Sequence, residues 1–147
     1  MTDFDNPIDP PAGWQRDHVE QYVASNGADG HHWRGVPTLL LTTVGRRTGK
    51  ARRTPLIYGR DGDRYLIVAS KGGSDDAPEW YRNLAADPRV RIQVGGDVLD
   101  GAAHTASAEE KARLWPVMTG IWPAYDEYQA RTRRDIPLVV IATSTAG

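Results

Sequence analysis

The stretch from Thr38 to Ser70 reads TLLLTTVGRRTGKARRTPLIYGRDGDRYLIVAS and contains three runs typical of β-strands. The runs at 38–43 and 54–58 flank a basic block. A third run, 64–70, follows Asp61-Gly62, a dipeptide that favours a tight hairpin turn. The stretch therefore predicts three consecutive antiparallel strands.

Apolar patterning elsewhere predicts further strands and several helices. The additional strands are expected at 89–94, 98–103 and 136–141. The helices are expected at 13–25, at 77–84, after the capping box that opens at Ser107, and after the Trp122-Pro123 break. Short strands linked mostly by hairpins do not alternate with helices as βαβ units do. We therefore expect a mainly β fold with helices, built on a small six-stranded antiparallel closed or split β-barrel.

The composition indicates a globular protein. The chain has 147 residues, 39% of them hydrophobic, and a formal net charge of -1. This length suits one core, so we expect a single domain over residues 13–147 after a flexible arm, 1–12, that is rich in proline and aspartate. The absence of cysteine excludes disulfides, thiolate metal sites and a cysteine nucleophile. An acidic start and the lack of a long apolar run predict a soluble, cytoplasmic protein.

The strongest functional signal is the basic block between the first two strands. Five positive charges fall within the nine residues 45–53, with no acidic residue among them. A basic loop held between strands predicts an anion site. The loop is not a Walker-type phosphate loop, because Gly45 to Gly49-Lys50 is one residue short and Ala51 replaces the magnesium-binding hydroxyl. No GxGxxG motif follows a strand, and an arginine loop without interleaved aromatics gives nucleic acid little support.

A second basic turn, Lys71-Gly72-Gly73-Ser74, follows the third strand. In a hairpin-linked sheet this turn can lie near the first one, so the two could share a ligand. Backbone amides of Gly72 and Gly73 can form a concavity that accepts an anion, while Lys71 supplies charge. The pair of turns predicts a phosphate or carboxylate ligand.

Several motifs, taken in order, resemble the deazaflavin-dependent nitroreductase family of actinobacteria. They are TTVGRRTG at 42–49, RRTPL at 52–56, VASKGG at 68–73, PEWYRNL at 78–84 and Asp87-Pro88. The resemblance implies the split β-barrel of FMN-binding, flavin-reductase-like proteins and the cofactor F420, a 5-deazaflavin with a phosphate and an oligoglutamate tail. The cofactor contacts that it implies are Arg46, Arg47, Thr48, Arg52, Arg53, Thr54, Pro55, Ala69, Ser70, Lys71, Gly72, Trp80 and Asn83.

The same resemblance implies an F420H2-dependent reductase that passes a hydride to a small quinone, enone or nitro compound. Trp122, Tyr125 and Tyr128 recur every three residues and share one helix face, so they would shape the acceptor side. Tyr125, Tyr128 and Ser70 are the candidate catalytic residues, since a phenol can hydrogen-bond an oxygen that gains negative charge. Family members that reduce nitroimidazoles often carry tyrosine where this chain has Ile57 and Trp122, which favours quinones or unsaturated carbonyls.

Other interpretations stay open on the sequence alone. An FMN enzyme of the same fold would leave most of the arginines without a partner, and a non-catalytic cofactor carrier or a nucleic-acid binder could use the same loop. His31-His32 does not predict a metal site, because adjacent side chains point apart and no carboxylate keeps suitable spacing. A homodimer and a peripheral contact of the first helix with a membrane are further hypotheses.

Overall fold

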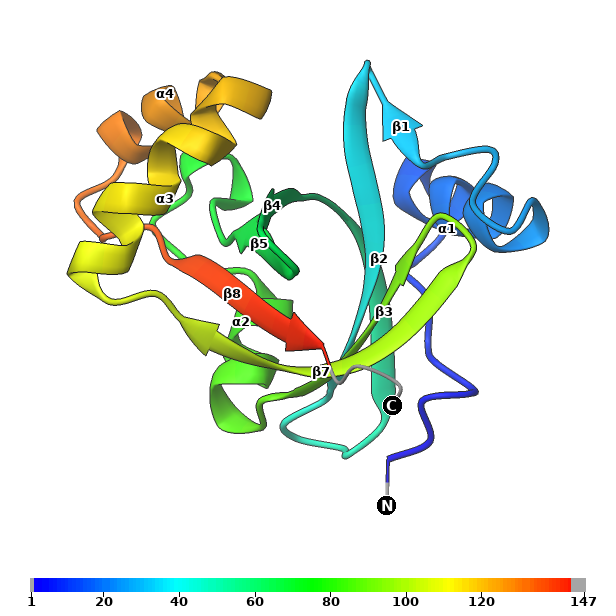
Figure 1. Ribbon diagram of the computed structural model, residues 1–147. Coiled ribbons are helices and arrows are strands. Elements are labelled where there is room, and N and C mark those ends of the chain that lie inside the picture. The colour runs from blue at the N-terminus through cyan, green and yellow to red at the C-terminus, as the bar shows by residue number, and fades with distance from the viewer. Residues whose placement is uncertain (1, 144–147) are drawn as a thin grey trace.

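The computed structural model describes residues 2–143, which form one curled antiparallel sheet flanked by helices (Figure 1). The strands are β1 (His32–Trp33), β2 (Val36–Val44), β3 (Ala51–Ile57), β4 (Gly59–Asp61), β5 (Arg64–Val68), β6 (Arg89–Val94), β7 (Asp97–Thr105) and β8 (Leu138–Thr143). The α-helices are α1 (Trp14–Ala24), α2 (Glu79–Ala86), α3 (Ala108–Ile121) and α4 (Ala124–Arg131), and a short 3-10 helix, η1, spans Lys71–Gly73.

The expected mainly β class, the six expected strands and the four expected helices are confirmed. The strand count is not, because the described residues form eight strands rather than six. The two extra strands, β1 and β4, are only two and three residues long. Such short segments carry no readable alternation, so the sequence pattern could not separate them from turns.

The expectation of three consecutive paired strands is wrong at its second step. β2 pairs with β3 from Thr38–Ile57 to Val44–Ala51, but within the described residues no other strand pairs with β3. The Asp61-Gly62 hairpin instead joins β4 to β5, and β5 pairs with β8. The sheet order is β1-β2-β6-β7-β8-β5-β4, with β3 beside β2, so the edge of β3 facing away from β2 lies outside the sheet.

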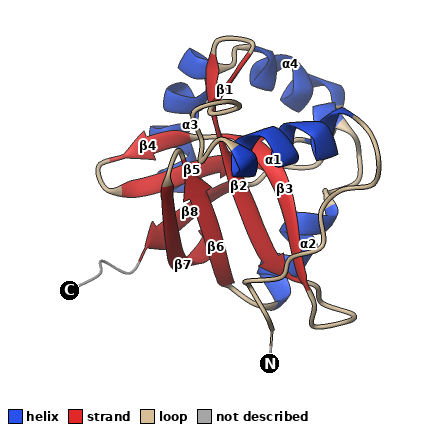
Figure 2. Ribbon diagram, turned by 90° about the vertical axis from the view of Figure 1, so that its right-hand side faces the viewer, coloured by secondary structure: helices blue, strands red, loops and turns tan. Residues whose placement is uncertain are grey.

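The apolar runs are buried on both faces of the sheet. Leu39 and Leu41 face a core inside the curl, and Leu40, on the opposite face, packs against Val19 and Tyr22 of α1 (Figure 2). All three leucines are fully buried, which explains why β2 lacks polar alternation. A second core, which includes Leu114 and Met118 of α3 and Tyr125 of α4, packs against β5 and β8.

The N-terminal arm lies along the free edge of β3. The amide of Ile8 donates to the Ala51 carbonyl oxygen at 2.8 Å, and the Arg53 amide donates to the Ile8 carbonyl oxygen at 2.9 Å. Ile8 thereby forms an isolated parallel bridge with Arg52. Residues for which the sequence predicts little order thus contact the basic strand.

The turn after β5 packs closely against the backbone of α4. Gly73 has φ 85°, and a Cβ on it would lie 2.8 Å from the Tyr128 carbonyl oxygen in α4. Its neighbour Gly72 also has a positive φ, 63°, but a Cβ there would meet nothing within 4 Å. The absence of a side chain at Gly73 therefore lets η1 lie directly against α4.

We expect Gly73→Ala to lower the free energy of unfolding by more than about 3 kcal/mol, because it combines a left-handed backbone with a clash against α4. Gly72→Ala is the matched control and should cost only about 1 to 2 kcal/mol, the backbone term alone. Urea denaturation measures both values. Equal losses in the two variants would show that the contact with α4 is not important for stability.

Candidate functional site

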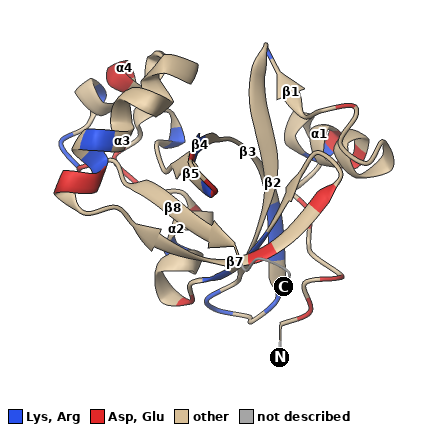
Figure 3. Cartoon of the chain, viewed as in Figure 1, with Lys and Arg blue, Asp and Glu red and all other residues tan. Residues whose placement is uncertain are grey.

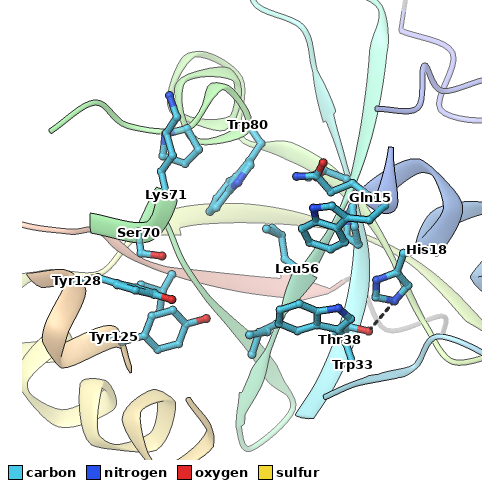
Figure 4. A pocket seen from close by; sticks show the side chains of 17 residues that line it. Gln15, His18, Trp33, Thr38, Leu56, Ser70, Lys71, Trp80, Tyr125 and Tyr128 are labelled. Atoms are coloured by element: carbon cyan, nitrogen blue, oxygen red, sulfur yellow. Dashed lines mark hydrogen bonds between the residues drawn. The ribbon is translucent and has the colours of Figure 1, made fainter. Parts of the chain in front are cut away.

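A cavity of about 380 Å³ is lined by side chains from several elements of the fold (Figure 4). Trp14, Gln15 and His18 of α1 and Trp33 of β1 line one side, and Tyr125 and Tyr128 of α4 line another. β3 contributes 54–57, and the turn after β5 contributes 70–72. Trp80 of α2 completes a wall that is mainly aromatic and aliphatic. Such a cavity suits a flat, largely apolar ring.

Few hydroxyl groups face this cavity. Tyr125 is 5% exposed, and its hydroxyl has no hydrogen-bond partner among residues 2–143. Burial raises the pKa of Tyr125 above its ordinary value of 10.0, so the phenol stays protonated at neutral pH. The Tyr128 hydroxyl accepts a weak hydrogen bond from Trp122 Nε1 at 3.4 Å. Both phenols and the hydroxyl of Ser70, which is 8% exposed, are drawn together at one side of the cavity (Figure 4).

The turn that carries Ser70 is held by Arg134, a residue that the sequence analysis did not single out. The Arg134 guanidinium donates to three carbonyl oxygens, those of Ala69 at 3.2 Å, Ser70 at 2.9 Å and Ser74 at 2.7 Å. These bonds fix the turn from outside the cavity. The sequence offered no signal for this role, because Arg134 lies more than sixty positions away along the chain.

The expected anion concavity of this turn is only partly available. The Gly73 amide donates to the Ser70 carbonyl oxygen at 2.9 Å, so it cannot also serve a ligand. Lys71 remains exposed at the cavity edge and makes no ion pair among the described residues. The turn therefore offers the Lys71 ammonium group to an anion, but not the Gly73 amide that the sequence predicted.

The basic block between β2 and β3 contains no acidic residue itself, but the fold brings two acidic side chains from other segments next to it. Arg46 Nη1 lies 2.6 Å from Glu79 Oε2, and Arg53 binds both carboxylate oxygens of Asp9 at 2.7 and 3.1 Å. The Arg46 guanidinium holds the pKa of Glu79 below its ordinary value. The remaining cations of the block, Arg47, Lys50 and Arg52, are exposed and have no ion pair within 4 Å in the described part of the chain. Figure 3 shows the Lys and Arg residues of this turn in blue, at the end of the molecule near the N-terminus.

Two smaller hollows connect the cavity to the basic turn. The first shares Thr54 and Trp80 with the cavity and adds Arg52, Arg53 and Asn83. The second shares Arg52 and Asn83 with the first, and it adds Gly45, Arg46, Arg47 and Thr48. The two basic turns therefore do not face each other across one small site. They lie at the two ends of a groove that follows α2.

Asn83 is nearly completely buried at the middle of this groove, with 4% exposure. Its Oδ1 accepts from the Arg46 amide and from Arg46 Nη1, both at 3.2 Å, and its Nδ2 donates to Thr43 Oγ1 at 3.3 Å. Its polar atoms thus tie the basic turn to β2. This geometry makes Asn83 a positioning residue for Arg46.

The structure brings most of the predicted site residues into this cavity and groove. The cavity includes Thr54, Pro55, Ser70, Lys71, Gly72, Trp80, Tyr125 and Tyr128. The hollows along the groove include Arg46, Arg47, Thr48, Arg52, Arg53 and Asn83. Ala69 differs, because it is fully buried and its amide and carbonyl groups are both hydrogen-bonded within the fold.

Aromatic residues at the cavity mouth were also missed. Trp14 and Trp33 stack with ring centroids 5.5 Å apart, and Trp33 lies 5.6 Å from Trp122. Trp33 sits in the β1–β2 hairpin, far in sequence from Trp122. A signal for this grouping exists only once the hairpin and the end of α3, which Trp122 caps, are placed in space.

An aromatic cavity next to hollows lined by cations is suited to a flat ring that bears an anionic tail, which favours a cofactor-binding class of protein. Comparison with known families identifies the class more closely. Residues 14–143 match the family described as F420H(2)-dependent quinone reductase. The chain belongs to this family, so it is an oxidoreductase, and its cofactor is F420.

Relatives agree with this family. An F420H(2)-dependent quinone reductase of Mycobacterium tuberculosis is 45% identical over 128 residues, which cover 84% of this chain and 86% of the relative. A solved structure titled F420-H2 dependent reductase (FDR-A) is 39% identical, with a TM-score of 0.68, and covers 72% of this chain and 94% of its own. Another, titled a domain-swapped dimer, is 37% identical, with a TM-score of 0.71, and covers 86% and 96%. The alternative cofactor FMN finds no support in these matches.

The expected membrane contact also lacks support in these findings. In residues 2–143, no helix combines the length and the apolar character that crossing a bilayer requires.

We expect Asn83→Ala to lower the free energy of unfolding by about 1 to 3 kcal/mol, because it leaves the Thr43 hydroxyl and the Arg46 amide without their buried partner. Arg82→Ala, at an exposed neighbouring position of α2, should change stability by less than about 0.5 kcal/mol. Chemical denaturation measures both variants. A loss at Asn83 no larger than the loss at Arg82 would contradict a positioning role.

Proposed function

We propose that the chain is an F420H2-dependent quinone reductase whose deazaflavin ring occupies the aromatic cavity and whose phosphate and oligoglutamate tail lie along the groove. The observation that supports this placement is the series of hollows with shared lining residues that leads from the cavity to Arg52 and Arg47, which make no ion pair within residues 2–143. Lys71 stands at the cavity end of the same path. Cations on a partly enclosed path suit an acidic tail, and the neutral cavity suits a ring.

The reaction requires the protein mainly to bind the cofactor and the acceptor and to orient them relative to each other. When bound, the reduced deazaflavin supplies the hydride that the acceptor takes up. A quinone also needs a proton to become a hydroquinone, and negative charge develops on its oxygen during the transfer. Tyr125 lines the cavity, burial raises the pKa of its phenol, and the hydroxyl has no hydrogen-bond partner in the described range 2–143, so it can donate a hydrogen bond to that oxygen. Tyr128 and Ser70 are neighbouring hydroxyls that complete this polar side.

The acceptor side favours a quinone over a nitroimidazole. Ile57 lines the cavity and its side chain offers no hydrogen bond, and Trp122 packs against Trp33, which lines the cavity. These apolar surfaces suit a planar ring with oxygen at its edge. Homodimer formation is a further part of the proposal, supported by the relative that is titled a domain-swapped dimer.

The double variant Arg47→Ala, Arg52→Ala should weaken F420 binding roughly 30-fold, because two solvent-exposed charge pairs with the tail, each worth up to about 1 kcal/mol, are lost. Titration followed by the fluorescence of the deazaflavin measures the dissociation constant. Arg82→Ala is the control, since Arg82 lines neither the cavity nor the groove hollows described above. Circular dichroism should be unchanged in both proteins. An unaltered dissociation constant in the double variant would rule out this placement of the tail.

Tyr125→Phe should lower kcat/KM for menadione roughly tenfold to a hundredfold, while F420 affinity and thermal stability stay close to those of the parent. Stability should hold because the hydroxyl has no partner to lose within residues 2–143. Steady-state oxidation of the reduced cofactor provides the rates. A rate equal to that of the parent would remove Tyr125 from the reaction.

The pH profile gives an independent check of the same group. Because burial raises the pKa of Tyr125 above 10.0, its donor proton is present at every lower pH. The parent should therefore show no alkaline decline below pH 10.0 that disappears in Tyr125→Phe. A decline near neutral pH that the variant lacks would mean that the phenol ionises earlier than its burial allows.

A further inference from the structure

The N-terminal arm forms part of the wall of the proposed tail groove. Ile8, Asp9, Pro10 and Pro11 line the same hollow as Arg52, Trp80 and Asn83. The two backbone hydrogen bonds of Ile8 to β3 hold the arm at that place. The groove is thus bounded by α2 on one side and by an acidic arm on the other.

Asp9 makes the most specific contact of the arm. Its two carboxylate oxygens accept hydrogen bonds from Nε and Nη2 of Arg53 in a bidentate salt bridge. Both side chains are only 20% exposed. A planar carboxylate on a guanidinium is the same contact that a glutamyl carboxylate of the cofactor tail would make. Asp9 therefore already occupies the position that such a carboxylate would take on Arg53.

Ion pairs of this kind already neutralise some cations of the basic block. Arg46 is paired with Glu79 and Arg53 with Asp9, which leaves Arg47, Lys50 and Arg52 without ion pairs in the described chain. Of these three, Arg47 and Arg52 line the groove hollows, whereas Lys50 does not. Two such cations can neutralise only a short run of carboxylates. Further carboxylates of a longer tail would meet Asp9 and Glu79 on the groove walls instead.

We propose that Asp9 determines the tail-length preference of this enzyme by keeping Arg53 paired, so that additional glutamates of a long tail gain no extra cation. This inference rests on the placement of the tail under the proposed function. Removing the charge of Asp9 should release Arg53 and favour long tails over short ones.

The test compares dissociation constants of the diglutamate and hexaglutamate forms of F420, followed by cofactor fluorescence without any turnover. In Asp9→Asn, affinity for the hexaglutamate form should rise at least about threefold more than affinity for the diglutamate form. The matched control is Asp5→Asn, which removes the same charge from the same arm. Asp5 pairs with Arg91, which lines neither the cavity nor the two groove hollows. An equal gain in both variants would reduce the effect to net charge and overturn the proposal.

A double-mutant cycle isolates Arg53 itself. The gain in affinity for the hexaglutamate form that Asp9→Asn produces should vanish in the double variant that also carries Arg53→Gln. The single variant Arg53→Gln should leave the length preference near that of the parent. A gain that persists without Arg53 also overturns the proposal. If Arg47→Ala, Arg52→Ala leaves binding unchanged, the placement of the tail fails. If that variant binds weakly but Asp9→Asn shows no length effect, only the role of Asp9 fails.

Discussion

The site depends on one constraint of the sheet, which is that β3 pairs with β2 along one edge and leaves its other edge outside the sheet. An unpaired edge normally has to be covered. Here the arm covers it near Arg52 through the Ile8 bridge, and residues 54–57 line the cavity. If β5 paired with β3, as the hairpin signal suggested, the sheet would close at the place where the cavity now opens.

Charge pairing then determines which parts of the basic strand can serve a ligand. The block looks uniformly cationic in sequence, yet Asp9 and Glu79 neutralise two of its members from positions 44 and 33 residues away. Of the exposed cations that remain, Arg47 and Arg52 line the hollows beside α2, and Lys50 lies outside them. Because an ion pair with a solvent-exposed carboxylate contributes little to stability, the Arg46–Glu79 pair matters more for the local potential than for the fold.

Much of the fold was predictable because its signals are local. The capping box of Ser107 and Glu110 forms as expected, and the alternation at 89–94 marks β6 correctly. Strand pairing was less predictable, since it depends on contacts between distant segments. Most of the residues that the motif resemblance singled out line the cavity or the groove hollows, whereas Arg134 and Trp33 carried no local signal. Their roles arise from carbonyl oxygens and an indole ring that only the folded chain brings near them.

The turn after β5, on the proposed cofactor side of the cavity, and α4, on the proposed acceptor side, are packed against each other. Gly73 lies against the backbone of Tyr128, and the Thr132 hydroxyl donates to Asp75 at 2.7 Å, so α4 is packed directly on the turn that carries Lys71. Arg134, just beyond α4, braces the same turn at three carbonyl oxygens. A displacement of this turn would therefore move Tyr125 as well. Since hydride transfer is sensitive to the relative placement of donor and acceptor, this shared support explains how a protein with few polar groups in its cavity can still position both.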